Sequence, residues 1–267
     1  MRNQRRFRFQ VFLCLGLLAS LMVSLGPLAS AAVTVEVVAT GLNNPRGLDV
    51  APNGDVYVAE AGKGGNGPCI AGGEGKSCLG ATGAITAIEN GNEEQHRVVT
   101  GLPSLAPEGG VAALGPSDVD FRGPRALVTI GLGADPTLRA SLGQGGRELA
   151  TVHTLTKRGD MTRLGDIAAY EIAANPDGDQ PSSALDTNPN SVYYQDDGAV
   201  VADAGGNALL HVDEDGKVST LAVFPFKMVP APDFLGLPPG TKIPMQPVPT
   251  SVTRGPDGAY YVGQLTG

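Results

Sequence analysis

The sequence of 267 residues contains no tryptophan, and aromatic residues make up only 5% of the chain. Protein grooves that hold carbohydrate rely on large aromatic rings, so this scarcity argues against a carbohydrate-binding groove. Basic residues are few as well, since 19 Lys and Arg stand against 27 Asp and Glu, for a net charge of −8. Nucleic-acid binding requires a basic surface, and the charge balance therefore argues against nucleic acid as a partner.

Histidine is equally scarce, with only His96, His153 and His211 in the chain. A catalytic zinc ion needs about three converging protein ligands. We expect these histidines on a fourth strand, in an insertion and on a third strand, positions that do not converge. Serine and cysteine nucleophile motifs are also missing. These absences favour a non-enzymatic role.

Residues 1–31 are predicted to be a signal peptide rather than part of the fold. Four arginines precede the apolar run Val11–Leu28, and Ala29-Ser30-Ala31 forms a small-residue cleavage site before Ala32. An uncleaved anchor is the alternative, because the run approaches the length that spans a bilayer. The polar residues within the run and the cleavage site favour removal. The pair Arg5-Arg6 leaves both the general and the twin-arginine export routes open.

Cleavage would leave residues 32–267 as a secreted domain, periplasmic or extracellular. Its 15 basic and 27 acidic residues give a net charge of −12, which disfavours anionic membranes as partners.

Two cysteines remain, Cys69 and Cys78, in one glycine-rich segment. In an oxidising compartment such an isolated pair predicts a disulfide.

Abundant glycine and proline, 38 and 21 residues, are typical of a β-rich and turn-rich domain. The segment Asn188–Leu221 predicts four short strands joined by tight turns, with strands at Ser191–Tyr194, Ala199–Ala202, Ala208–Val212 and Lys217–Leu221. Asp-Gly between apolar runs favours hairpin turns, because glycine adopts a positive φ without strain. A four-stranded meander of this kind is one blade of a β-propeller.

The pattern occurs four times. Each copy begins with a proline, followed by a short strand, a turn and a second apolar strand; the prolines are Pro45, Pro116, Pro189 and Pro249. They are 71, 73 and 60 residues apart, more than a minimal blade needs, so we expect insertions at 62–82, 131–164 and 224–248. The sequence therefore predicts an all-β propeller with four-stranded blades, about three and a half of them in this chain.

Further strands are expected outside the part of the pattern that all four copies share. We expect Val33–Thr40 as an outer strand that closes the ring, and Ala84–Ile88 and Gln95–Thr100 in the first blade. In the second blade we expect Gly165–Ile172 as third strand and no fourth strand. A short helix is expected at Pro136–Leu142. The insertion 224–248 is proline-rich and is expected to be extended, largely without ladder hydrogen bonds.

The fourth copy stops after its second strand, so the ring is expected to be incomplete. We therefore expect the natural product to continue beyond Gly267, and a complete ring to be a monomer. Propeller topology also sorts the loops. The tight turns, such as Asn53-Gly54 and Asp197-Gly198, belong to one face, and the three insertions belong to the other. Function concentrates in long loops on a rigid scaffold, so the long-loop face is the predicted binding face.

Polar residues near the channel on this face are the candidate ligand-binding residues: Asn44, Arg46, Glu60, Asp118, Asp135, Asn188, Asn190, Asp203 and Asn207. Glu60 and Asp203 both end second strands, and their oxygens could contribute to a calcium site. The alternative role for each Asp and Asn is to cap a turn and bond backbone N–H groups.

Five segments together resemble one known family: Arg163–Glu171 (RLGDIAAYE), Val201–Leu210 (VADAGGNALL), Gly67–Cys78, Val128–Pro136 (VTIGLGADP) and Leu237–Val252. They are similar to the ScyD/ScyE family of exported propellers, which is named for its association with biosynthesis of the sunscreen pigment scytonemin. The resemblance spans residues 33–267 and implies an NHL-like propeller outside the cytoplasm. It implies no catalytic residues. Family members continue well past residue 267.

Two functions are compatible with these observations. The first is an exported scaffold that binds a small molecule or a protein on its long-loop face. The second is a calcium-dependent propeller enzyme of the lyase or lactonase type with a channel site. The lack of an acid–base pair or histidine set favours the first.

Overall fold

The computed structural model describes residues 35–72, 75–91, 94–180 and 183–266. The chain forms two units, which meet in sequence between Val37 and Val38, and the following account concerns the second unit. The predicted signal peptide lies outside the described residues. Within those residues, no helix is long and apolar enough to cross a membrane.

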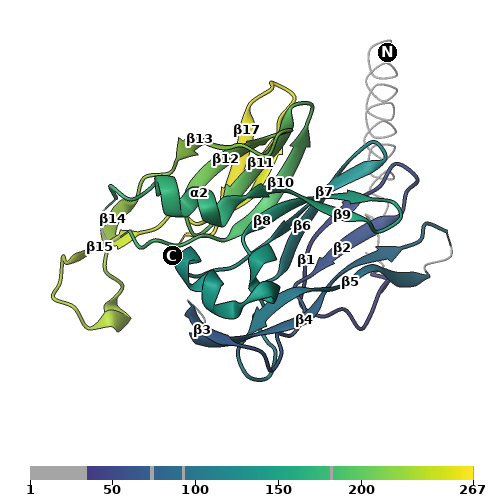
Figure 1. Cartoon of the computed structure of the whole chain (residues 1–267). Helices are drawn as coiled ribbons and strands as arrows, with labels where there is room; N and C mark the ends of the chain where they lie inside the picture. Colours follow the sequence, from purple (N-terminus) through teal and green to yellow (C-terminus); the bar gives the residue numbers. More distant parts are fainter. Residues whose placement is uncertain (1–34, 73–74, 92–93, 181–182, 267) are drawn as a thin grey trace, which may run out of the picture. The chain divides into compact units, whose positions relative to one another are not determined.

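The third predicted blade is an antiparallel four-stranded meander (Figure 1). Its strands are β10 (Pro189–Gln195), β11 (Gly198–Asp203), β12 (Ala208–Asp213) and β13 (Val218–Val223). Gly198 starts β11 at φ 130°, and a Cβ there would lie 2.0 Å from the carbonyl oxygen of Val212. Glycine is thus required at this turn, and the four strands confirm the prediction made from the sequence.

The second blade is also four-stranded, which corrects the prediction that it lacks a fourth strand. Its strands are β6 (Pro116–Arg122), β7 (Arg125–Ile130), β8 (Thr151–Thr156) and β9 (Met161–Asp166). The insertion therefore ends before Thr151. It contains two 3-10 helices, η1 (Pro136–Leu142), as predicted, and η2 (Gln144–Glu148).

The strand expected at Gly165–Ile172 is wrong, because helix α2 (Ile167–Ala174) occupies most of it. Four alanines give this segment a high helix propensity. The Asp166 carboxylate accepts the backbone N–H of Ala169 and caps the start of the helix. Asn175 ends it in the left-handed conformation, at φ 39°.

The first blade has longer strands than expected. It consists of β1 (Pro45–Val50), β2 (Val56–Glu60), β4 (Gly75–Ile88) and β5 (Gln95–Ala106), and the short β3 (Cys69–Gly72) pairs with the start of β4. The expected third and fourth strands are the blade ends of β4 and β5. Cys69 and Cys78 lie directly opposite each other on β3 and β4 and form the predicted disulfide.

The fourth copy is a two-stranded sheet of β16 (Pro249–Arg254) and β17 (Tyr260–Gln264). The insertion before it contains a ladder, contrary to expectation: β14 (Lys227–Pro230) pairs with β15 (Lys242–Met245), and η3 (Asp233–Leu235) lies between them. Such a two-stranded ribbon consists of edges, where proline is tolerated.

The outer strand expected at Val33–Thr40 is not formed in its described part. Residues 35–42 belong to no strand, and Val35, Val37 and Val38 are exposed. Thr40 instead exchanges two hydrogen bonds with the side chain of Gln95, at 3.0 and 2.7 Å. A strand needs a continuous backbone partner, and a side chain supplies only one pair of bonds.

Consecutive blades are joined through their inner strands and through apolar cores between the sheets. β6 packs against β1 and β10, and β10 packs against β16. Along β11, Ala199 and Val201 join the core shared with the second blade, whereas Val200 and Ala202 join the core shared with the fourth. This alternation is the two-residue period of a strand buried on both faces. The domain is a β-propeller, and its described sheets comprise one of five strands, two of four strands and the two-stranded sheets β14–β15 and β16–β17.

Candidate functional site

Each inner strand is irregular directly after its aligned proline. On β10, Pro189 pairs with Asp203 and Ser191 pairs with Ala202, so Asn190 is an extra residue without a ladder partner. The same β-bulge occurs on β6 and β16, and the register also shifts after Pro45 on β1. A bulge turns a side chain away from the direction that the regular strand would give it.

A hollow of about 560 Å³ lies where these four strands begin. Its lining includes the residue directly before and the residue directly after every aligned proline: Asn44, Arg46, Gly115, Ser117, Asn188, Asn190, Val248 and Thr250. We call this hollow the channel mouth. Since all four copies contribute equivalent positions, it is a product of the repeat.

The remaining lining of the channel mouth places it on the long-loop face. Ala61, Gly131 and Ala204 directly follow the second strands of three blades, where two insertions begin. Ala112 to Leu114 and Val248 belong to connections between blades. A volume of this size is within the range of small-molecule sites, which measure roughly 300–1,000 Å³.

Four of the nine candidate residues line the channel mouth. The Asn44 amide donates to the carbonyls of Gly62 and Gly110 at 2.7 and 2.8 Å. Arg46 donates from Nη2 to the Ala113 carbonyl at 2.8 Å. Asn190 and Asn188 are the other two. Asn190 donates to the Thr250 carbonyl at 2.7 Å, and the Asn188 side chain makes no hydrogen bond to a described residue.

Ser117 and Thr250 also line the channel mouth, although the sequence analysis did not select them. A signal for them was present in the alignment on the prolines, because they occupy the same position as Arg46 and Asn190.

Glu60 lies away from the channel mouth and is fully buried. Its carboxylate accepts hydrogen bonds from Arg97 at 2.9 and 2.8 Å, from the Asn43 backbone and from the Thr86 hydroxyl. Burial acts to raise the pKa of Glu60, but these hydrogen bonds outweigh it, and the pKa is lowered from its ordinary value. Glu60 therefore fastens the residues before β1 to the first blade.

Asp203 is also fully buried and bound by protein donors. It accepts hydrogen bonds from the Thr187 hydroxyl and from the backbone N–H groups of Asn188, Gly205 and Gly206, at 2.6 to 3.2 Å. Burial raises its pKa even so. The carboxylate shapes the loop after β11, as expected for an Asp that caps a turn.

Asp203 has acidic neighbours on α2 and in the segment between α2 and β10, namely Glu171, Asp177 and Asp186. Burial raises the pKa of Glu171 to about 8, and the neighbouring Asp203, Asp177 and Asp186 raise it further. The pKa of Asp186 is raised to about 6, again mainly by burial. Asn207, also buried, donates to the Asp177 carboxylate at 2.9 Å and accepts the Val248 N–H at 3.2 Å. Asn207 thereby connects Asp177 to Val248, the residue directly before β16.

The two remaining candidates have structural roles. Asp135 caps η1 by accepting the backbone N–H and the hydroxyl of Thr137 at 2.8 and 2.7 Å. Asp118, on β6, accepts the N–H of Val192 on β10 at 3.0 Å. Burial raises the pKa of Asp118 to about 6, while its hydrogen bonds act in the opposite direction.

Calcium at Glu60 and Asp203 does not fit these contacts. The two carboxylates lie in different blades, and every oxygen of either one accepts hydrogen bonds from protein donors. A calcium ion takes six to eight oxygen ligands. Across the described ranges, no group of three or more His, Cys, Asp or Glu is arranged to hold a metal ion.

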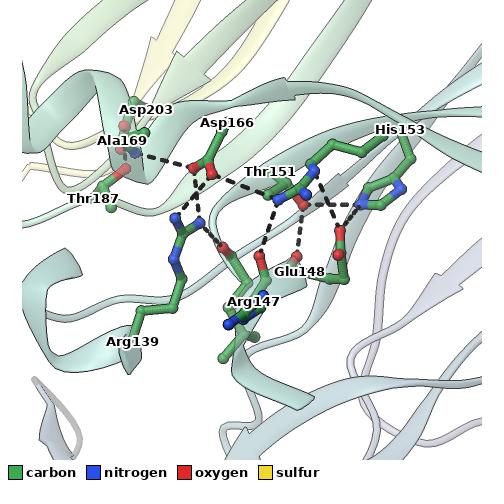
Figure 2. A network of polar contacts seen from close by, with 11 residues as sticks. Arg139, Arg147, Glu148, Thr151, His153, Asp166, Ala169, Thr187 and Asp203 are labelled. Atoms are coloured by element: carbon green, nitrogen blue, oxygen red, sulfur yellow. Dashed lines mark hydrogen bonds and ion pairs between the residues drawn. The ribbon is translucent and has the colours of Figure 1, made fainter. Parts of the chain in front are cut away.

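A second hollow, of about 590 Å³, lies beside η1 and η2 and is lined by Arg139, Arg147 and Arg163. Figure 2 shows the Arg139 guanidinium facing the Asp166 carboxylate, to which it donates at 2.7 and 2.9 Å. Arg163 forms an ion pair with Glu148 at 3.7 Å. These contacts fasten the insertion to β9.

His153 lies in the same network, and its Nε2 is 2.9 Å from the Thr151 hydroxyl (Figure 2). Burial, followed by the nearby Arg163 charge, lowers the pKa of His153 to about 4, so the ring is neutral at pH 7. His96 and His211 lie on β5 and β12, in the first and third blades. The three histidines therefore do not converge.

No family model matches the sequence, and no curated protein matches it. Among solved structures, selenomethionine-substituted virginiamycin B lyase from Staphylococcus aureus is similar at 14% identity and a TM-score of 0.43, over 84% of this chain. A catalytically inactive variant of that lyase with quinupristin gives 14% identity and a TM-score of 0.41 over 86%. The chain spans about half the length of these structures, 52% in both cases.

Proposed function

We propose that this chain is an exported β-propeller that acts as a binding scaffold, with a small molecule or a protein partner held on its long-loop face. The observation that carries the proposal is the channel mouth, to which all four sequence repeats contribute the residues that flank their prolines. Bulges at these positions direct side chains away from the regular sheet. A scaffold needs no reactive group there, and the described lining consists of amides, hydroxyls, one arginine and apolar residues that range from alanine to leucine.

A filling substitution tests the site. Thr250 is half-buried, lines the channel mouth and makes no side-chain hydrogen bond with the described part of the chain, so Thr250→Phe should occupy the hollow without breaking a contact. Thr253, exposed and on the same strand β16, provides the matched control Thr253→Phe. A fragment library would be screened against the purified mature domain by ligand-observed NMR.

We expect library members to bind the unchanged domain and Thr253→Phe, and to lose binding to Thr250→Phe. If the hits bind all three proteins equally, the channel mouth is not the site. If no compound of the library binds the unchanged domain, the proposal of a small-molecule site at the channel mouth fails.

Export is tested separately. In a bacterial host with an intact secretory system, the full chain should appear outside the cytoplasm with Ala32 as its first residue, which the intact mass would show. A cytoplasmic product that still carries residues 1–31 would contradict export.

The calcium-dependent enzyme remains the alternative, and no contact of the described residues favours it.

A further inference from the structure

We infer that the channel mouth binds a small organic molecule through a carboxylate group. This inference rests on the proposed function and adds the chemical class of the ligand. Arg46 is the only charged residue among the described residues that line the hollow, and no Asp or Glu lines it. Arg46 also forms no ion pair with a described residue. In a chain of net charge −8, an uncompensated guanidinium makes this concave surface locally attractive to anions.

Arg46 has donors to spare. A guanidinium carries five N–H groups, and one nitrogen, Nη2, donates to the Ala113 carbonyl at 2.8 Å. This bond leaves the other N–H groups of the exposed side chain for a ligand. The planar fork of a guanidinium matches the two oxygens of a carboxylate, which is why arginine is preferred where carboxylates are recognised.

Asn188 is a further polar residue in the lining of the hollow. Its Oδ1 is buried without a hydrogen-bond partner and lies against Gly131, where a Cβ would come within 2.4 Å of it. Asn188 is half-buried and lines the hollow. The free N–H groups of Arg46 call for a ligand that accepts hydrogen bonds.

The other lining residues indicate which kind of carbon skeleton the ligand has. Leu114, Val248 and Leu265 give the hollow apolar walls, and none of the described residues that line it is aromatic. An aliphatic acid therefore fits better than a sugar acid or a planar aromatic acid. A volume of about 560 Å³ suits a single small molecule.

N-acetyl-L-leucine is the probe, and N-acetyl-L-leucinamide is its neutral analogue of the same shape. Calorimetric or NMR titration of the mature domain at low salt should show the acid binding about tenfold more tightly than the amide, as expected for a hydrogen bond to a charged group. Arg46→Gln should reduce acid affinity to that of the amide, and Arg46→Lys should retain part of the preference. Arg254→Gln is the control, because it removes an exposed arginine that does not line the channel mouth. This substitution should leave acid binding unchanged.

Equal binding of acid and amide, or full acid binding by Arg46→Gln, would overturn the carboxylate class. The scaffold proposal would survive that result if Thr250→Phe still abolished binding of neutral library hits. A peptide acid, Ac-Ala-Ala-Ala-Ala-Ala-Leu-OH, forms a third arm. If it binds and N-acetyl-L-leucine does not, the ligand is the carboxyl end of a polypeptide and the small-molecule inference is wrong. Unchanged melting temperatures of the Arg46 variants would exclude misfolding.

Discussion

The Asp118 carboxylate on β6 accepts the backbone N–H of Val192 on β10 at 3.0 Å, and so connects the inner strands of two consecutive blades. Three further contacts follow the same rule, namely Asp49 to the Phe121 N–H, Asp120 to the Tyr194 N–H and Ser191 to the Val252 N–H. The acceptors are always the second or fourth residue after an aligned proline. Inner strands of neighbouring blades share no backbone ladder, so side chains of the repeat satisfy donors that would otherwise be left unpaired.

The first prediction concerns this connection. Asp118→Ala removes the acceptor of the Val192 N–H in a half-buried place, and we expect it to lower the free energy of unfolding by about 1–3 kcal/mol. Urea denaturation followed by circular dichroism measures the loss. Asp179→Ala, at an exposed carboxylate, is the control and should cost less than about 0.5 kcal/mol. Equal effects of the two substitutions would show that the contact between blades contributes nothing.

The second prediction concerns pH. The pKa of Glu171 is raised to about 8 by burial first and by neighbouring acids second, so the folded protein holds a proton that the unfolded chain releases near its ordinary pKa. Stability from this proton is fully present below about pH 4.5 and is lost as pH rises towards 8, by up to ~1.4 kcal/mol per pH unit. We expect the domain to be more stable at pH 6.5 than at pH 8.0.

The variant Glu171→Gln distinguishes the contribution of Glu171 to this pH dependence from the contributions of other titrating groups. Glutamine cannot titrate, so the variant should lose most of the difference in unfolding free energy between pH 6.5 and pH 8.0. Asp118 and Asp120, with pKa values raised to about 6, and His153, with a pKa lowered to about 4, titrate below this window. A variant with the same pH dependence as the unchanged domain would refute the assignment to Glu171.

The third prediction concerns calcium. Because Glu60 and Asp203 are saturated by hydrogen bonds from the protein, we expect 1 mM calcium chloride to leave the melting temperature of the mature domain unchanged relative to EDTA. An ion that binds only the folded state raises stability by mass action, so a calcium-binding site would be visible in this experiment. A rise of several degrees that EDTA reverses would revive the calcium-dependent enzyme.

The fourth prediction concerns the disulfide. Cys69 and Cys78 face each other across the β3–β4 ladder, and exported protein should have both in oxidised form. Alkylation without reductant should add no label to either cysteine, and alkylation after reduction should add two, as measured by intact mass. Two labels without reductant would remove the disulfide and weaken the proposal of export.

The sequence predicted the elements that depend on neighbouring residues. In the third blade, Asp-Gly turns between short apolar runs predicted all four strands, because turn geometry is a local property. The prediction failed at Gly165–Ile172, where a strand was expected and the Asp166 cap and the alanine-rich sequence form α2. It also failed at Val33–Thr40, since β pairing depends on a partner that local sequence does not reveal.

The candidate site divides in the same way. The repeat alone identified the prolines, and with them Asn44, Arg46, Asn188 and Asn190 at the channel mouth. Only the tertiary structure decided that Glu60 and Asp203 are occupied by protein donors from distant segments, such as Arg97 and Thr187. A sequence shows that a carboxylate ends a strand, but its hydrogen-bond partners are set by how the strands pack. For that reason the sequence by itself determined the repeat and its polar positions, and the packing of the blades decided which of them remain available to a ligand.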